Sequence, residues 1–144
     1  MSPRRAPDYF VVSSIVSTLR ASSGVTATAT NGIYTEVPQG TPAPYVKVSA
    51  SIAGRRSDTL GRFGKQILMD VDCVSAGESQ LLGIQMRDAV SRALDFGQNT
   101  QTLTEHRLLG LQYDDDTYFP EMVNNVKHHH HVSSFRVWTE QSSS

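Results

Sequence analysis

The sequence predicts an α+β fold, with a mainly antiparallel sheet of about four strands, two helices packed on one face and a long hairpin arm. Two observations favour this class. Several segments alternate apolar and polar residues, which is the period of a strand, while two others repeat apolar residues at helical spacing. The strand-like segments also follow one another in neighbouring pairs with a helix between the pairs, as in layered α+β folds.

Length and composition narrow the class of protein. Of the 144 residues 38% are apolar, and 13 basic side chains nearly balance 14 acidic ones, for a net charge of −1. This balance argues against a protein whose main function is to bind nucleic acid tightly. No apolar run reaches the roughly 20 residues of a membrane span. The single cysteine excludes an internal disulfide and fits folding in a reducing cytoplasm. We expect one domain over residues 8–140, a flexible basic arm over 1–7 and a frayed tail over 141–144.

The first expected element is an amphipathic helix over residues 8–20, with Asp8 as its N-cap. Polar residues interrupt this stretch and argue against an export signal. Its apolar side chains form one stripe: Tyr9, Val12, Val16 and Leu19. Residues 21–31 are mostly small or polar and predict irregular structure that ends in an Asn-Gly turn.

A proline-rich segment then leads into the sheet. Residues 33–34 can form a short strand, and the prolines of residues 38–44 place the connection at the sheet margin, because proline has no amide hydrogen. Residues 45–53 and 65–74 alternate as two strands of one hairpin. The predicted core faces of these strands are Val46, Val48, Ala50 and Ile52, and Ile67, Met69, Val71 and Cys73.

A capping box and a continuous apolar stripe predict the second helix. Ser75 and Glu78 have the spacing at which each side chain satisfies an amide at a helix start, and Gly97 supplies a left-handed stop. The stripe contains Leu82, Met86, Ala89, Val90, Ala93 and Leu94.

Two further strands are predicted at residues 106–113 and 132–138, separated by a long excursion that holds Asp114–Asp116, Pro120 and His128–His131. We interpret the histidine run as a solvated loop, since successive side chains of an extended chain point to opposite faces and a structural zinc site needs four ligands. The acidic run lacks the spacing and the glycine of a calcium loop and predicts a solvated turn. No metal site is expected.

No reaction centre is predicted either. Cys73 lies on an apolar strand face and is interpreted as a small hydrophobic residue. Asp70 and Asp72 share a strand face, which a polar sheet surface explains better than a catalytic carboxylate pair. The nucleophile elbow, the P-loop and the dinucleotide-binding glycine pattern are absent. We therefore expect neither enzyme activity nor a cofactor.

Residues 54–64 form a glycine-punctuated basic loop, and together with Lys65, which follows it, four cations surround only Asp58. This loop is either a mobile hairpin tip or a contact arm whose arginines meet acidic groups or phosphates of a partner. Its apolar side chains favour the contact arm, since a purely solvated loop does not need them. The candidate contact residues are Arg55, Arg56, Leu60, Arg62, Phe63 and Lys65.

The segment over residues 32–46, GIYTEVPQGTPAPYV, resembles the corresponding stretch of tail terminator (tail completion) proteins of long-tailed bacteriophages. A pattern-level likeness continues through residues 69–72, 89–94 and 134–137, so the resemblance covers residues 8–138. The Asp- and His-rich excursion departs from the family pattern and leaves the local partner contacts open. The motif residues, which we expect to fix the entry of the chain into the sheet, are Pro38, Gln39, Gly40, Pro44 and Tyr45.

The resemblance implies a virion protein, made in the host cytoplasm, that forms a hexameric ring at the head-proximal end of the tail tube. Such a ring stops tube polymerisation and joins the tail to the head. Its partners would be copies of itself, the tail tube protein and the head-completion connector, with DNA only as cargo in the channel and no membrane. Two alternatives stay open: another head–tail joining or tube-related subunit, and a small ligand-binding regulatory domain with a pocket between helices and sheet.

Overall fold

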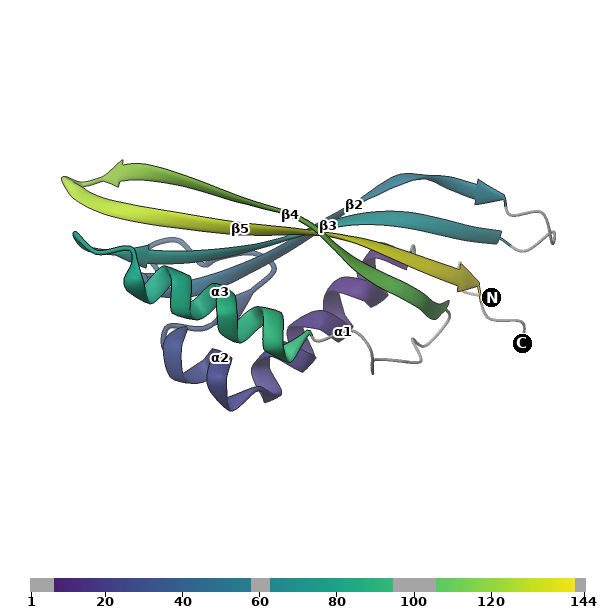
Figure 1. Cartoon of the computed structure of the whole chain (residues 1–144), viewed down its shortest axis with the longest axis horizontal. Coiled ribbons are helices and arrows are strands. Elements are labelled where there is room, and N and C mark those ends of the chain that lie inside the picture. Colours follow the sequence, from purple (N-terminus) through teal and green to yellow (C-terminus); the bar gives the residue numbers. More distant parts are fainter. Residues whose placement is uncertain (1–6, 58–62, 95–105, 142–144) are drawn as a thin grey trace.

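The computed structural model describes residues 7–57, 63–94 and 106–141 (Figure 1). Side chains are described within 11–51, 67–94 and 113–138. These ranges contain three helices and five strands. In chain order they are α1 (Pro7–Ala21), α2 (Ser23–Thr28), β1 (Ile33–Tyr34), β2 (Tyr45–Ser57), β3 (Phe63–Ala76), α3 (Leu81–Ala93), β4 (His106–Val123) and β5 (Val126–Gln141).

The strands form one twisted sheet in the order β1-β2-β3-β5-β4. The short β1 pairs with β2 in parallel, and every other neighbouring pair is antiparallel. The three helices lie together on one face of this sheet, and the opposite face is open (Figure 1). The β2–β3 and β4–β5 hairpins point toward opposite ends of the long axis of the molecule (Figure 1).

The core lies between the helices and the covered face of the sheet. Alternate residues of β2 and β3 reach it because side chains of a strand alternate between faces. Val46, Val48, Ile67, Met69, Val71 and Cys73 are all fully buried there. Met86, Val90 and Leu94 pack against them from the region of α3, with Leu82, Ala89 and Ala93 partly buried alongside.

These observations confirm the predicted α+β class and both apolar strand faces as far as their side chains are described. The sheet has a fifth strand, which is the short pairing expected at residues 33–34. Residues 21–31 are not irregular as predicted, because Ser23–Thr28 form α2. The Ser22 hydroxyl accepts from the Val25 amide at 3.5 Å and caps this helix.

The apolar stripe of α1 is rotated from the predicted one. Val11 and Ile15 are buried and were not in the predicted stripe, whereas Val12 is only partly buried. Val16 and Leu19 are buried as predicted. The predicted N-cap, Asp8, lies inside the helix, which begins at Pro7.

The predicted capping box is wrong. Ser75 belongs to β3 and is fully buried, and α3 begins six residues later, at Leu81. Gln80 occupies the cap position without a side-chain bond to the helix, while the Ser79 hydroxyl accepts from the Leu81 amide at 3.1 Å. β3 continues through Ser75 because this residue pairs with His129 of β5 in the sheet.

The predicted basic loop over residues 54–64 is shorter than expected. Both strands of the hairpin continue into it, β2 as far as Ser57 and β3 from Phe63, with a register shift between Ile52 and Gly54. At the chain ends, Pro7 belongs to α1 and Gln141 to β5. The rest of the predicted arm and tail, and Gly97, lie outside the described residues.

Candidate assembly surface

The excursion predicted between the last two strands is a long hairpin, so the predicted loop and turn are both wrong. β4 and β5 pair in an antiparallel register from His106 opposite Gln141 to Val123 opposite Val126. The connection consists of Asn124 and Asn125, whose φ angles of 50° and 64° are both left-handed. Asparagine tolerates this region, and two such residues form the tight turn that suits the twist of a hairpin.

The outer half of this hairpin is exposed, although it carries many large apolar side chains. β4 is the edge strand of the sheet, and residues 113–127 are all exposed. A long edge strand with exposed apolar side chains is an unusual surface for a protein that works alone. The exposed apolar residues are Tyr113, Tyr118, Phe119, Met122, Val123 and Val126.

Two of the four histidines are buried, which corrects their interpretation as a solvated loop. His129 and His131 face the helices, with 0% and 2% exposure. The His129 Nε2–H donates to the Gly77 carbonyl at 2.7 Å, which leaves its Nδ1 to accept from the Tyr118 hydroxyl at 2.9 Å. The histidine therefore ties the end of β3 to the edge strand.

His131 lies under α3, where the helix approaches the sheet closely. A Cβ added at Gly83 would clash with the His131 ring and would meet the Ser75 hydroxyl at 2.9 Å. His131 Nδ1 and the Ser75 hydroxyl have no hydrogen-bond partner among the described residues. Burial lowers the pKa of His131, and the positive charge of Arg87 adds to this effect. The site therefore favours the neutral form of the His131 imidazole.

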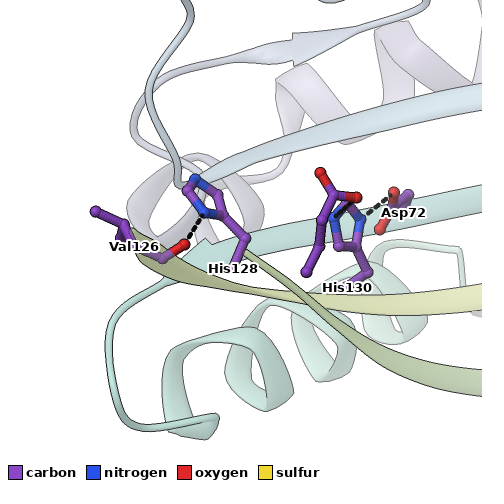
Figure 2. Close-up of polar contacts among 5 residues, drawn as sticks. Asp72, Val126, His128 and His130 are labelled. Atoms are coloured by element: carbon purple, nitrogen blue, oxygen red, sulfur yellow. Dashed lines mark hydrogen bonds and ion pairs between the residues drawn. The ribbon is translucent and has the colours of Figure 1, made fainter. Parts of the chain in front are cut away.

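His130 points to the open face and lies between two carboxylates (Figure 2). Its Nδ1–H donates to Asp72 Oδ2 at 2.8 Å, and its Nε2 lies 3.4 Å from Glu121 Oε2. The Phe119 ring stacks on the imidazole with centroids 4.4 Å apart. Burial raises the pKa of Asp72, although the hydrogen bond from His130 opposes the shift. This arrangement, the His130 clamp, links β3, β5 and β4.

The neighbouring His128 is less enclosed. Its Nδ1–H donates to the Val126 carbonyl of its own strand at 3.1 Å (Figure 2). The part of the chain with described placement contains no group of three or more His, Cys, Asp or Glu side chains that could hold a metal ion.

The acidic run lies on β4. Asp116 accepts from the Ser133 hydroxyl at 2.8 Å and lies 3.9 Å from Arg87 of α3. A hydrogen bond with Asp116 and a small contribution from burial raise the pKa of Tyr113 to about 12. Asp114 lies 3.5 Å from Arg136, while Asp115 accepts from the Asp116 amide.

The predicted polar face of β3 is confirmed. The Ser134 hydroxyl donates to Asp70 at 2.7 Å, and Asp72 belongs to the His130 clamp. Cys73 is fully buried on the other face, and burial raises the pKa of its thiol. Such a thiol packs as a small hydrophobic side chain and is a poor nucleophile.

The proline-rich segment packs beside β1. The Asn31 side-chain amide donates to the Ala43 carbonyl at 3.1 Å, and the Asn31 backbone amide donates to the Pro44 carbonyl at 3.0 Å. The Ala43–Pro44 peptide bond is cis, and Gly40 has a φ of 83°.

Tyr45 is the first residue of β2. Burial raises the pKa of its hydroxyl, and the negative charges of Asp72 and Glu121 add to this effect. The last motif residue therefore lies in the electrostatic field of the His130 clamp. Gln39 is exposed in the loop before Gly40.

The predicted contact arm lies at the far end of the sheet from the β4–β5 turn (Figure 1). Arg55 and Arg56 belong to β2, and Phe63 and Lys65 to β3. Leu60 and Arg62 lie outside the described residues. The fold thus separates the arm from the exposed hairpin.

One pocket opens at the β4–β5 turn, with a volume of about 520 Å³. It is lined by Gly77, Glu78, Met122, Asn125, Val126 and Lys127. This position differs from the ligand-binding alternative, which expected a pocket between helices and sheet.

The exposed hairpin was missed because its sequence signals conflict. Three successive aspartates and Pro120 are unusual in a strand. The signal that could have found the hairpin is Asn124-Asn125 between two valines, since asparagine favours a two-residue turn. The alternation from His129 through His131, Ser133 and Phe135 to Val137 also predicts a strand.

Comparison with solved structures finds this layered fold in a chain of another protein. A chain from a structure described as the virion of a native gene transfer agent particle superimposes with a TM-score of 0.74. The match covers 91% of this chain and 98% of that one at 22% sequence identity, and so shows a shared fold. No curated protein sequence matches this chain.

The chain belongs to the family described as Tail completion protein gp17, which matches residues 13–140. Members of this family are structural proteins of the virion tail, and the chain is therefore a tail protein. The resemblance found in the proline-rich segment is confirmed. Among the described residues, no helix is both long and apolar enough to span a membrane.

Proposed function

We propose that this protein forms a ring, of six subunits by family resemblance, at the head-proximal end of the phage tail tube. There it ends tube polymerisation and joins the tail to the head connector. Its partners are copies of itself, the tail tube protein and the head-completion protein. It performs no chemistry and needs no cofactor, and DNA is only passing cargo.

The observation that carries this proposal is the exposed edge of the sheet. β4 is an 18-residue edge strand with five exposed large apolar side chains, and Val126 at the start of β5 adds a sixth. An exposed strand edge of this length is a template on which another chain can pair. On the opposite margin, β1 pairs only with Val46 and Lys47, which leaves the following residues of β2 as a second edge. A protein with two different open margins can associate head to tail, and such contacts close into a ring when the rotation closes.

The basic arm extends this proposal to the neighbouring parts of the tail. We assign Arg55, Arg56, Leu60, Arg62, Phe63 and Lys65 to contacts with an adjacent subunit or with the tail tube. The motif residues Pro38, Gln39, Gly40, Pro44 and Tyr45 keep the β1 margin in the conformation that the ring requires.

The direct experiment is loss of the protein from the phage or phage-like particle. We expect abnormally long or unjoined tails in electron micrographs, and rings with a central channel in the purified protein. Tails of normal length that join heads without the protein would overturn the role in termination.

A finer test separates termination from other joining roles. The triple variant R55A/R56A/R62A should lose ring formation or tail joining while keeping its thermal unfolding temperature. If rings form and tails have normal length but fail to bind heads, the arm serves head joining and not termination. If ring formation and joining are both intact, the arm has no assembly role.

A further inference from the structure

The two margins of the sheet have unpaired strand edges that match in length and in direction. We propose that residues 115–119 of β4 in one subunit pair antiparallel with the free edge of β2, at residues 47–51, in a second copy. One sheet then continues from subunit to subunit. This inference rests on the proposed ring and names its contact.

The free edge of β4 is uninterrupted over residues 115–119. Among the described strands β4 has a neighbour only on its β5 side. A register irregularity between Tyr113 and Asp115 precedes this stretch. Pro120 follows it, and proline has no amide hydrogen to donate to a further strand. About five residues is an ordinary strand length, so this edge can accept one short strand of another chain.

The complementary edge lies on β2. β1 pairs with the first part of β2 only, as far as Lys47. The β2–β3 ladder becomes irregular between Ile52 and Gly54. Between these two points, at residues 48–52, none of the described strands pairs with the outer edge of β2. The free stretches of β2 and β4 are therefore equally long.

The directions of the strands suit a contact between β4 and β2. The pairs β2–β3, β3–β5 and β5–β4 are all antiparallel, so β2 and β4 run in opposite directions within one subunit. When a rotation places the next copy so that the sheet continues, its β2 is antiparallel to the β4 of the first copy. The contact joins one edge to a different edge, which is the head-to-tail geometry of a closed ring.

The two faces of the sheet limit the register of this contact. Side chains of a strand alternate between faces, so open-face residues of β4 must lie opposite open-face residues of β2. Thr117 belongs to the open face, since Val132 and Asp72 connect it in register to Lys47. Thr117 then lies opposite Ser49 of the next copy or, one step along, opposite Ser51.

The side chains at this seam complement one another. In the first register the Phe119 ring, which is 42% exposed, lies opposite the exposed Lys47 of the next copy. An ammonium group on an aromatic ring is a favourable contact. Glu121, also on the open face of β4, is 51% exposed and adds a carboxylate beside that ammonium group.

A contact between two β4 edges lacks this complementarity. β4 contains four carboxylates, and such a contact would gather the carboxylates of both copies along one seam. Like charges on neighbouring strands destabilise their pairing. β2 contains no carboxylate, so pairing of β4 with β2 avoids this repulsion.

Engineered cysteines test the contact. The single native cysteine, Cys73, is fully buried and does not compete. Oxidation or a short thiol-reactive cross-linker should link full-length S49C/T117C, or S51C/T117C in the second register, into a ladder of covalent oligomers on a denaturing gel. S91C/T117C is the matched control and should give no ladder, because Ser91 is exposed on α3, on the helix side of the sheet. If T117C alone gives dimers as readily, two β4 edges pair with each other and the proposed contact is wrong.

A charge at Ser51 provides a second measurement. In either register Ser51 lies opposite or diagonal to Asp115 of the next copy. S51D should therefore weaken self-association about fivefold. S51K, the matched control at the same exposed position, should associate at least as tightly as the wild type. Sedimentation measures the association, and circular dichroism checks that both variants are folded. Equal association of S51D and S51K would contradict the contact.

The outcomes separate this contact from the ring itself. If wild-type rings form but neither double-cysteine variant cross-links, the contact is wrong and the ring proposal survives. If the wild type forms no ring, even at a tube end, and tails end normally without it, the proposed function fails together with the contact.

Discussion

The Nδ1–H of His130 on β5 donates to Oδ2 of Asp72 on β3 across 2.8 Å. This bond lies near the base of the exposed part of the β4–β5 hairpin, where Glu121 and Phe119 of β4 also meet the imidazole. The His130 imidazole on β5 therefore contacts both the edge strand β4 and the central strand β3, and so connects the edge of the sheet to its centre. Because the surface proposed for assembly lies on that edge strand, its position depends on this contact.

Removing the imidazole should disturb Asp72. H130A leaves the partly buried carboxylate without its donor, so the pKa of Asp72 should rise further and stability should fall by about 1–3 kcal/mol at pH 7. Carboxyl NMR titration and urea unfolding measure these two effects. H128A is the control, since His128 bonds only a carbonyl of its own strand. If the Asp72 carboxyl titrates in H130A as it does in the wild type, the hydrogen bond from His130 does not stabilise the Asp72 carboxylate.

The raised pKa of Asp72 also predicts the sign of a pH dependence. Between the ordinary value of 3.8 and the higher folded value, the folded chain binds more protons at Asp72 than the unfolded chain. The contribution of Asp72 to stability therefore decreases as pH rises through this window. D72N should remove that decrease, which urea unfolding across the acid range can measure. If the stability of D72N decreases with pH as steeply as that of the wild type, Asp72 is not the group responsible.

His131 should act in the opposite direction. Its pKa is lowered below 6.5, so the unfolded chain takes up a proton first and stability falls as pH drops below 6.5. The groups around His131 are Arg87 of α3, Asp116 and Tyr118 of β4, Cys73 opposite it on β3, and the flanking histidines.

The variant H131L should flatten this pH dependence between about pH 5 and 7, where a histidine ordinarily titrates. Thermal unfolding across that range measures the effect. H128Q removes a less buried histidine from the same run and should keep the slope. A slope that H131L leaves intact must come from another group.

Gly83 should tolerate no side chain. In G83A the new methyl group would meet the His131 ring and the Ser75 hydroxyl, and we expect a loss of about 1–3 kcal/mol from overpacking. G24A is the matched control in α2, because its methyl group would meet only Ala89 Cβ and Ser22 Oγ at ordinary distances of 3.8 and 3.9 Å. It should be neutral or slightly stabilising. Equal unfolding midpoints for the two variants would refute the close approach.

Gly40 tests the proline-rich segment through its backbone alone. Its φ of 83° is left-handed, and no atom lies within 4 Å of an added Cβ. A side chain at this position would therefore strain the backbone without clashing with any neighbour. G40V should cost about 1–2 kcal/mol, while G40N should cost less because asparagine tolerates this region. Chemical denaturation compares the two. If valine and asparagine behave alike, the left-handed conformation is not required there.

Alternation and helical spacing in the sequence were enough for the α+β class, the covered faces of β2 and β3, and the stripe of α3. Burying apolar area is the main favourable term in folding, and these patterns show which side chains are buried. The motif in residues 32–46 was enough for the family.

The tertiary structure decided which histidines of the run are buried and which partners the aspartates of the acidic run contact. His129 and His131 are polar side chains, yet they are buried because β3, β4 and α3 surround them and Gly77 and Tyr118 bond His129. Ser75 likewise belongs to a strand because His129 pairs with it, although its own sequence neighbours favour a helix cap. Local preference is worth about 1 kcal/mol per residue, and pairing with a distant strand outweighs it.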